Sequence, residues 1–271
     1  MTQWALAHEA ILRFLSFLLI FVLMAALELT RPRRALTGSK LHRWLSNAGI
    51  LVSATVSARL LGQIAGPLLA VGMAVLAAQQ GWGLLNGLAL PGWIELIIAL
   101  LALDFAIWLQ HVLSHRIPFF WRLHRVHHAD RDIDVTTALR FHPGEIIASL
   151  LYKAVIIAAL GPSAASVILF EILLNGCALF NHANIDIPRQ LDKSLRRILV
   201  TPDMHRVHHS TDRTEQRRNF GFCLSVWDRL FGTYQSAPKA GHLQMQIGLK
   251  AFQDKRADRL TWSLLLPFRK L

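Results

Sequence analysis

The pentapeptide His-Arg-Val-His-His occurs twice in this chain, at residues 124–128 and again at residues 205–209. A third pair, His111 and His115, precedes the first copy, so three short segments hold eight of the 13 histidines. On an α-helix, side chains at positions i, i+3 and i+4 share one face. The fold therefore either brings these three segments to one site or leaves eight polar rings scattered.

Eight convergent imidazoles are too many for one metal ion of ordinary geometry. Neutral imidazole binds iron, zinc, copper and nickel, but tetrahedral and octahedral ions take about four or six ligands. The segments therefore predict two metal ions held close together by His111, His115, His124, His127, His128, His205, His208 and His209.

The three segments resemble the HxxxH, HxxHH and HxxHH boxes of the fatty acid hydroxylase / sterol desaturase superfamily. The resemblance covers about residues 93–235 and includes RFHPGE at 140–145, NHANID at 181–186, TPDMHRVHHS at 201–210 and NFGFCLSVWDRLFGTY at 219–234. It implies an integral-membrane oxidoreductase in which two iron ions use O2 to hydroxylate or desaturate a C–H bond of a lipid, such as a sterol or a fatty acyl chain.

The resemblance also implies further ligands outside the three boxes. His182 and His142 occupy positions where the family has additional motif residues, so both are candidate metal ligands. Asn184 is a further candidate, either directly or through a water molecule.

The composition indicates a membrane protein. Hydrophobic residues make up 53% of the chain and charged residues 17%, a balance typical of several membrane spans. Apolar runs occupy residues 4–29, 93–110, 146–160 and 163–181, whereas residues 183–271 are polar and basic. We therefore predict an all-α, multi-span membrane protein in which a cytoplasmic helical cap holds the histidine-rich site.

Residues 45–79 are ambiguous, because Arg59, Gln63 and Gly66-Pro67 interrupt the run. This region is one long tilted helix, a span preceded by an interfacial helix, or two short spans. The basic segment 31–34 after the first run marks the cytoplasmic side. The boxes share one site only if residues 45–79 cross once overall, which gives five crossings and a cytoplasmic metal site. We divide the chain into N-terminal membrane helices with a connecting loop, residues 1–92, and a catalytic region, residues 93–271.

The net charge of +12 is concentrated around the apolar runs and in the C-terminal third. This distribution fits contact with anionic lipid headgroups, and we expect no nucleic-acid partner. No haem-attachment, dinucleotide-binding or Walker motif is visible. Electrons must then come from an external donor, a ferredoxin or a small cytochrome with its reductase. Basic residues that either steer such a donor or bind headgroups are Arg196, Arg197, Arg206, Arg213, Arg217 and Arg218.

Acidic residues near the boxes are candidates to accept hydrogen bonds from metal-binding imidazoles. Asp104 lies inside an apolar run, two turns before His111 on the same helical face, and a carboxylate in a membrane span usually has a partner or a function. Other candidates are Asp130, Asp134, Glu145 and Asp203. Aromatic residues that either line a lipid channel or lie at the membrane interface are Phe119, Phe120, Trp121, Phe141 and Trp227.

Two other functions remain open on the sequence alone. A zinc membrane hydrolase would use histidine ligands, but catalytic zinc usually has three protein ligands and the HExxH motif is absent. A metal transporter or sensor would need polar residues within the spans, whereas these histidines gather at span ends. Dependence of activity on O2 and a reductant separates the oxidoreductase from both alternatives.

Overall fold

The computed structural model describes residues 2–66 and 69–270. In these residues the regular secondary structure is helical, accompanied by isolated β-bridges. Five of the described helices are long and apolar enough to cross a bilayer: α2 (Glu9–Thr30), α3 (Lys40–Ile64), α5 (Gly92–Arg116), α7 (Pro143–Leu160) and α8 (Ala164–His182). This architecture confirms the predicted all-α fold with several membrane spans.

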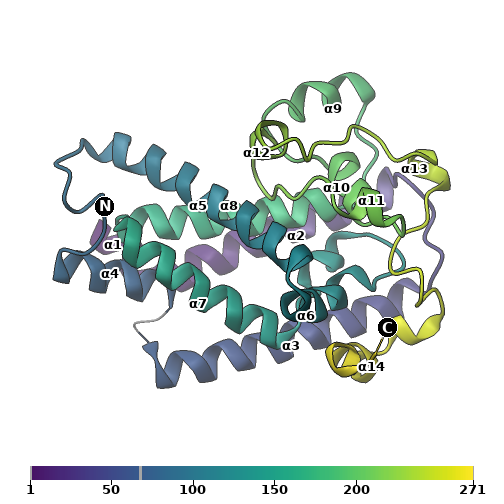
Figure 1. Ribbon diagram of the computed structural model, residues 1–271, viewed down its shortest axis with the longest axis horizontal. Helices are drawn as coiled ribbons and strands as arrows, with labels where there is room; N and C mark the ends of the chain where they lie inside the picture. The colour runs from purple at the N-terminus through teal and green to yellow at the C-terminus, as the bar shows by residue number, and fades with distance from the viewer. Residues whose placement is uncertain (1, 67–68, 271) are drawn as a thin grey trace.

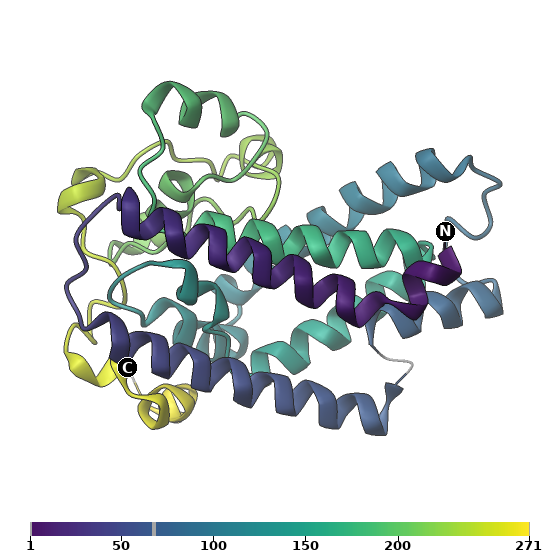
Figure 2. The same ribbon diagram turned by 180° about the vertical axis from the view of Figure 1, so that it is seen from behind.

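Shorter helices complete the described chain. The α-helices among them are α1 (Thr2–Ala7), α4 (Ala70–Gln80), α6 (Pro118–His128), α9 (Arg189–Leu195), α10 (Pro202–His208), α11 (Arg213–Gln216), α12 (Val226–Leu230), α13 (Gly241–Gln244) and α14 (Leu260–Leu265). Three 3-10 helices are η2 (Val135–Leu139), η3 (Lys255–Asp258) and η4 (Leu266–Phe268). The long helices run along the long axis of the molecule, and α9 to α14 form a cap at the end opposite the N-terminus (Figure 1, Figure 2).

The ambiguous region 45–79 holds one spanning helix, α3, followed by the short helix α4. With 11 residues, α4 rises only about 16 Å, roughly half of a bilayer core. Helix α3 leaves the cap end, and α4 lies at the opposite end, where α5 begins (Figure 1). This arrangement fits the expected single crossing, although the short helix follows the span instead of preceding it. The assignment of the cap to the cytoplasmic side stays a prediction.

Apolar side chains hold the long helices together and also cover their outer surface. One core cluster joins α4, α5, α7 and α8 through residues such as Ala74, Leu103, Ile157 and Phe170. Large apolar side chains on the outer faces are exposed, and Val155 on α7 retains 67% of its accessible surface. A soluble fold would bury such residues, so these faces suit contact with lipid chains.

Local signals start the two helices that carry the repeated pentapeptide. Pro118 occupies the first turn of α6, a position where its missing N–H is not needed. Pro202 does the same in α10, where the Thr201 side chain accepts a hydrogen bond from the backbone N–H of Met204. The first pentapeptide therefore forms the end of α6, and the second forms the end of α10 with His209 as its C-cap.

A buried ionic network fixes α3 to the segment that follows the first pentapeptide. The Arg43 guanidinium, 1% exposed, donates to Asp130 at 2.7 and 2.8 Å and to Asp134 at 2.5 Å. Burial alone would raise the pKa of Asp130, but Arg43 lowers it to about 2. These two carboxylates, which the sequence offered as partners for metal-binding imidazoles, therefore pair with Arg43.

Replacing Arg43 should destabilise the protein strongly. Arg43→Met leaves Asp130 and Asp134 without their cation, and breaking a buried ion pair on one side costs about 3–5 kcal/mol. Arg256→Met is the matched control, because Arg256 pairs with Asp254 on the exposed surface. Thermal unfolding in mild detergent should show a much lower unfolding temperature for Arg43→Met and an unchanged one for Arg256→Met. Equal unfolding temperatures for the two variants would contradict this role.

Candidate metal centre

Nine buried histidines form two adjacent clusters in the described residues, and within each cluster one ring nitrogen per residue lies within 4.8 Å of all the others. The first cluster contains His111, His115, His124, His128 and His208. The second contains His127, His182, His205 and His209. The structure thus brings together the eight histidines of the three boxes and His182.

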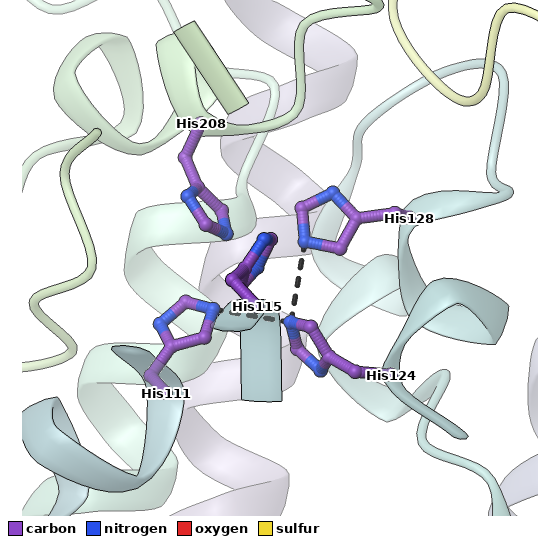
Figure 3. Close-up of side chains that lie close together, drawn as sticks. All are labelled: His111, His115, His124, His128 and His208. Atoms are coloured by element: carbon purple, nitrogen blue, oxygen red, sulfur yellow. Dashed lines mark hydrogen bonds between the residues drawn. The ribbon is translucent and has the colours of Figure 1, made fainter. Parts of the chain in front are cut away.

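Each pentapeptide divides its histidines between the two clusters. In α6, the pair His124 and His128 joins the first cluster and His127 joins the second. In the second copy the arrangement is reversed, because His205 and His209 join the second cluster and His208 joins the first. Figure 3 shows the first cluster, in which imidazoles from α5, α6 and α10 converge. The repeated motif therefore links the two clusters, and the rings of His128 and His209 stack with centroids 4.6 Å apart.

Ring nitrogens that lack a proton face one another inside the first cluster. His111 Nδ1–H donates to the Phe220 carbonyl at 2.7 Å, and His124 Nδ1–H donates to Glu145 Oε1 at 2.6 Å. A neutral imidazole with its proton on Nδ1 carries a lone pair on Nε2. The two Nε2 atoms lie 3.1 Å apart, and two neutral rings of this tautomer have no proton to share across that contact. A cation between them is the simplest way to make this contact favourable.

The spacing of the nitrogens also suits metal coordination. His124 Nε2 lies 3.2 Å from His128 Nε2, and in the second cluster His182 Nε2 lies 3.1 Å from both His127 Nε2 and His205 Nε2. A metal ion about 2.1 Å from each of two nitrogens at a right angle places those nitrogens about 3 Å apart. The donor set of both clusters therefore fits a transition-metal ion.

Acceptors behind the rings orient several imidazoles, as is usual at metal sites. Besides the partners of His111 and His124, the Ala178 carbonyl accepts from His182 Nδ1–H at 2.7 Å and the Arg218 carbonyl accepts from His208 Nδ1–H at 2.8 Å. Three of these four acceptors are backbone carbonyls. Sequence reasoning singled out Glu145 and missed the carbonyls, because a backbone oxygen has no signature in the sequence.

Two carboxylates position the segment that supplies the Phe220 carbonyl. Asp228, which the sequence analysis did not single out, accepts from the backbone N–H of Phe220 at 2.9 Å and of Gly221 at 2.8 Å. Asp104 accepts from Trp227 Nε1 at 2.8 Å and from the backbone N–H of Leu224 at 3.2 Å. Asp104 therefore acts on the loop beside His111 and, among the described residues, forms no hydrogen bond to an imidazole.

Five histidines of the two pentapeptides are held in their neutral form. Burial, reinforced by neighbouring imidazoles, lowers the pKa of His208 to about 3. The same causes lower the pKa of four others well below the ordinary value: His127, His128, His205 and His209. Neutral imidazole is the form that binds metal ions.

Three other candidates have different surroundings. His142 lies outside both clusters, because the helix that begins at Pro143 uses its ring as a cap: Nδ1 accepts from the Gly144 N–H at 3.1 Å. Its Nε2–H donates to the Leu264 carbonyl at 3.2 Å. The Asn184 amide bonds to the Arg34 backbone in both directions. Asp203 pairs with Arg206 and Arg33.

A cavity of about 230 Å³, here called the inner cavity, reaches the first cluster from the membrane side. His111 and His124 form part of its wall. Its other walls are largely apolar and include Phe17, Leu51, Ile107, Leu139, Phe141, Leu174 and Phe222. Phe141, one of the predicted channel aromatics, also stacks on His127 with ring centroids 4.5 Å apart. Phe119, in contrast, is 65% exposed on the outer surface. The inner cavity therefore suits an apolar chain next to the histidines.

Comparisons with known proteins connect this centre to a family. The chain is 27% identical to alkylglycerol monooxygenase of Homo sapiens over 143 residues. These aligned residues make up 51% of this chain and 30% of the human protein. It is 26% identical over 157 residues to ornithine lipid hydroxylase OlsE of Rhizobium tropici, an alignment that covers 58% of this chain and 46% of OlsE. It is 23% identical over 151 residues to cholesterol 25-hydroxylase of Rattus norvegicus, an alignment that covers 55% of this chain and 49% of the rat protein.

The matched region spans between about a third and half of the length of these relatives. No solved structure matches the chain significantly. The family model described as fatty acid hydroxylase matches residues 96–233, half of the chain, including all nine clustered histidines. The chain therefore belongs to the fatty acid hydroxylase family.

Proposed function

We propose that this protein is a membrane-bound, O2-dependent oxidoreductase that hydroxylates a C–H bond of a lipid. Its nine clustered histidines hold two iron ions, five ligands facing one ion and four the other. An external ferredoxin or small cytochrome supplies the electrons at the cap, which faces the cytoplasm. The observation that carries this proposal is the convergence of nine buried histidines in two clusters, in which ring nitrogens approach one another to 3.1–3.2 Å.

The relatives support the choice of reaction and of substrate class. All three are named as hydroxylases or monooxygenases, which favours hydroxylation over desaturation. The molecules in their names are an alkylglycerol, an ornithine lipid and cholesterol, which share a lipid character and differ in their polar groups. Clusters of five and four histidines also exceed the three ligands usual for a catalytic zinc ion.

Iron in these clusters supplies the redox chemistry that activates O2. The remaining tasks belong to the chain's own residues. Glu145 and the carbonyl of Phe220 hold the rings of His124 and His111 so that both Nε2 atoms face inward. Apolar walls, including Phe141 and Phe222, guide the substrate chain to this point and exclude water.

An isotope experiment tests the reaction. Full-length protein in mild detergent, loaded with iron and supplied with a reductant and a lipid extract, should place one 18O atom from 18O2 into a lipid product. The zinc-loaded protein should form none, because zinc has no redox chemistry. A product that takes its oxygen from water would point to hydrolysis and contradict the proposal.

The ligand set is tested by a pair of histidine variants. His127→Ala should lose at least one of two bound metal ions per chain in elemental analysis, because His127 faces His182 and His209 in the second cluster. His142→Ala should keep both ions, with a stability loss of about 1 kcal/mol from the missing helix cap. Metal loss in His142→Ala alone would overturn the assignment.

The orienting role of Glu145 predicts a weaker metal site in Glu145→Gln. A carboxylate behind a metal-binding imidazole typically contributes 10–100-fold in metal affinity or activity. Competition with a chelator should show that the metal affinity of Glu145→Gln is lower than that of the wild type by a factor in this range. Glu95→Gln is the matched control, because Glu95 accepts from Ser163 and Ser166 away from the clusters. Unchanged affinity in Glu145→Gln would show that the carboxylate is dispensable.

A further inference from the structure

A second, larger cavity lies among the long helices, away from the cap. This outer cavity has a volume of about 850 Å³ and is bordered by residues of α2, α3, α4, α7 and α8. Unlike the inner cavity, it is lined by several charged side chains: Glu9, Arg13, Arg59, Lys153 and Glu171. Ionisable groups within a membrane bundle are costly and usually have a function.

The charges of the outer cavity do not cancel. Arg13 contacts Glu9 and Glu171 at 2.8 Å, and Lys153 Nζ contacts Glu171 at 2.5 Å. These four charges balance one another and tie α2, α7 and α8 together. Arg59 is an additional exposed cation, with no recorded ion pair among the described residues. Lys153 has three N–H donors, of which the recorded bond to Glu171 uses one. The cavity thus carries a net positive charge and free donors, which suit an anion.

The outer cavity adjoins the inner cavity beside the first histidine cluster. Five residues line both: Leu51, Ala54, Ile146, Lys153 and Asn175. On α7, Glu145 and Lys153 are eight residues apart on one helical face, which separates them by about 12 Å along the helix. A ligand anchored at Lys153 can therefore extend an apolar chain toward His111 and His124.

We propose that the outer cavity binds the anionic headgroup, a carboxylate or a phosphate, of the lipid substrate. This inference rests on the proposed function and specifies its substrate class. Lys153, Arg13 and Arg59 bind the anion, and the chain enters the inner cavity. Oxidation then occurs farther along the chain, beside His111 and His124, and not on the carbons next to the anion.

Binding measurements on the full chain test this site without turnover. Native mass spectrometry in mild detergent would compare three lipids with the same acyl chains: a phosphatidylglycerol, a carboxylate-headed amino-acid lipid and a neutral diacylglycerol. The wild-type protein should bind at least one anionic lipid ten or more times as tightly as the neutral lipid. The order of the two anionic lipids identifies the anion.

Substitutions test whether the cations of the outer cavity cause the preference for anionic lipids. Lys153→Met and Arg59→Met should each reduce it at least threefold, whereas Lys153→Arg should retain it. Arg59→Met leaves the recorded ion pairs of the cavity in place, so it stays informative if Lys153→Met fails to fold. Lys193→Met is the matched control, because Lys193 is exposed on α9 and its loss changes the net charge equally. This control should keep the wild-type preference.

Two results would overturn the headgroup site: equal binding of charged and neutral lipids by the wild type, or a full preference in both Lys153→Met and Arg59→Met. These results are distinct from a failure of the proposed function. Protein that prefers anionic lipids but never incorporates 18O would support the site and contradict the oxidoreductase. Protein that oxidises lipids without any preference would contradict only the headgroup site.

Discussion

The structure depends on one electrostatic constraint, the gathering of nine buried imidazoles in two adjacent clusters. The Nε2 atoms of His111 and His124 face each other at 3.1 Å, and Nδ1 of each ring lies against an acceptor on the other side. Such a contact is unfavourable in a buried site unless a cation lies between the nitrogens. Much of the surrounding fold keeps these rings in place, including the helix starts at Pro118 and Pro202 and the loop that presents the Phe220 carbonyl.

The division of the repeated pentapeptide shows how one motif could serve the two proposed ions. Positions i and i+4 contribute to one cluster and position i+3 to the other, with the assignment reversed between α6 and α10. No ligand is shared, yet the clusters touch through stacked rings such as His128 and His209. Neutral imidazole ligands would leave more positive charge on such ions than carboxylates would. In the buried network beside the clusters, the single guanidinium of Arg43 pairs with two carboxylates, Asp130 and Asp134.

Patterns along the chain predicted the architecture and the family, because hydrophobic runs and histidine spacing are local properties. The all-α, multi-span fold is confirmed. Which histidines share a cluster was not predictable, because it depends on how α6 and α10 meet across the bundle. His142 shows the limit of motif resemblance: the same sequence that suggests a ligand also starts α7 at Pro143, and the ring caps that helix. The role of Asp228 depends on a loop conformation that no spacing encodes.

The central claim, two metal ions held by two histidine clusters, is tested most directly by anomalous X-ray diffraction at the iron absorption edge on crystals of iron-loaded protein. The account predicts two adjacent peaks. One lies among the five rings that include His111 and His124, and the other among the four that include His127 and His182. A single peak, or peaks outside these rings, would contradict it.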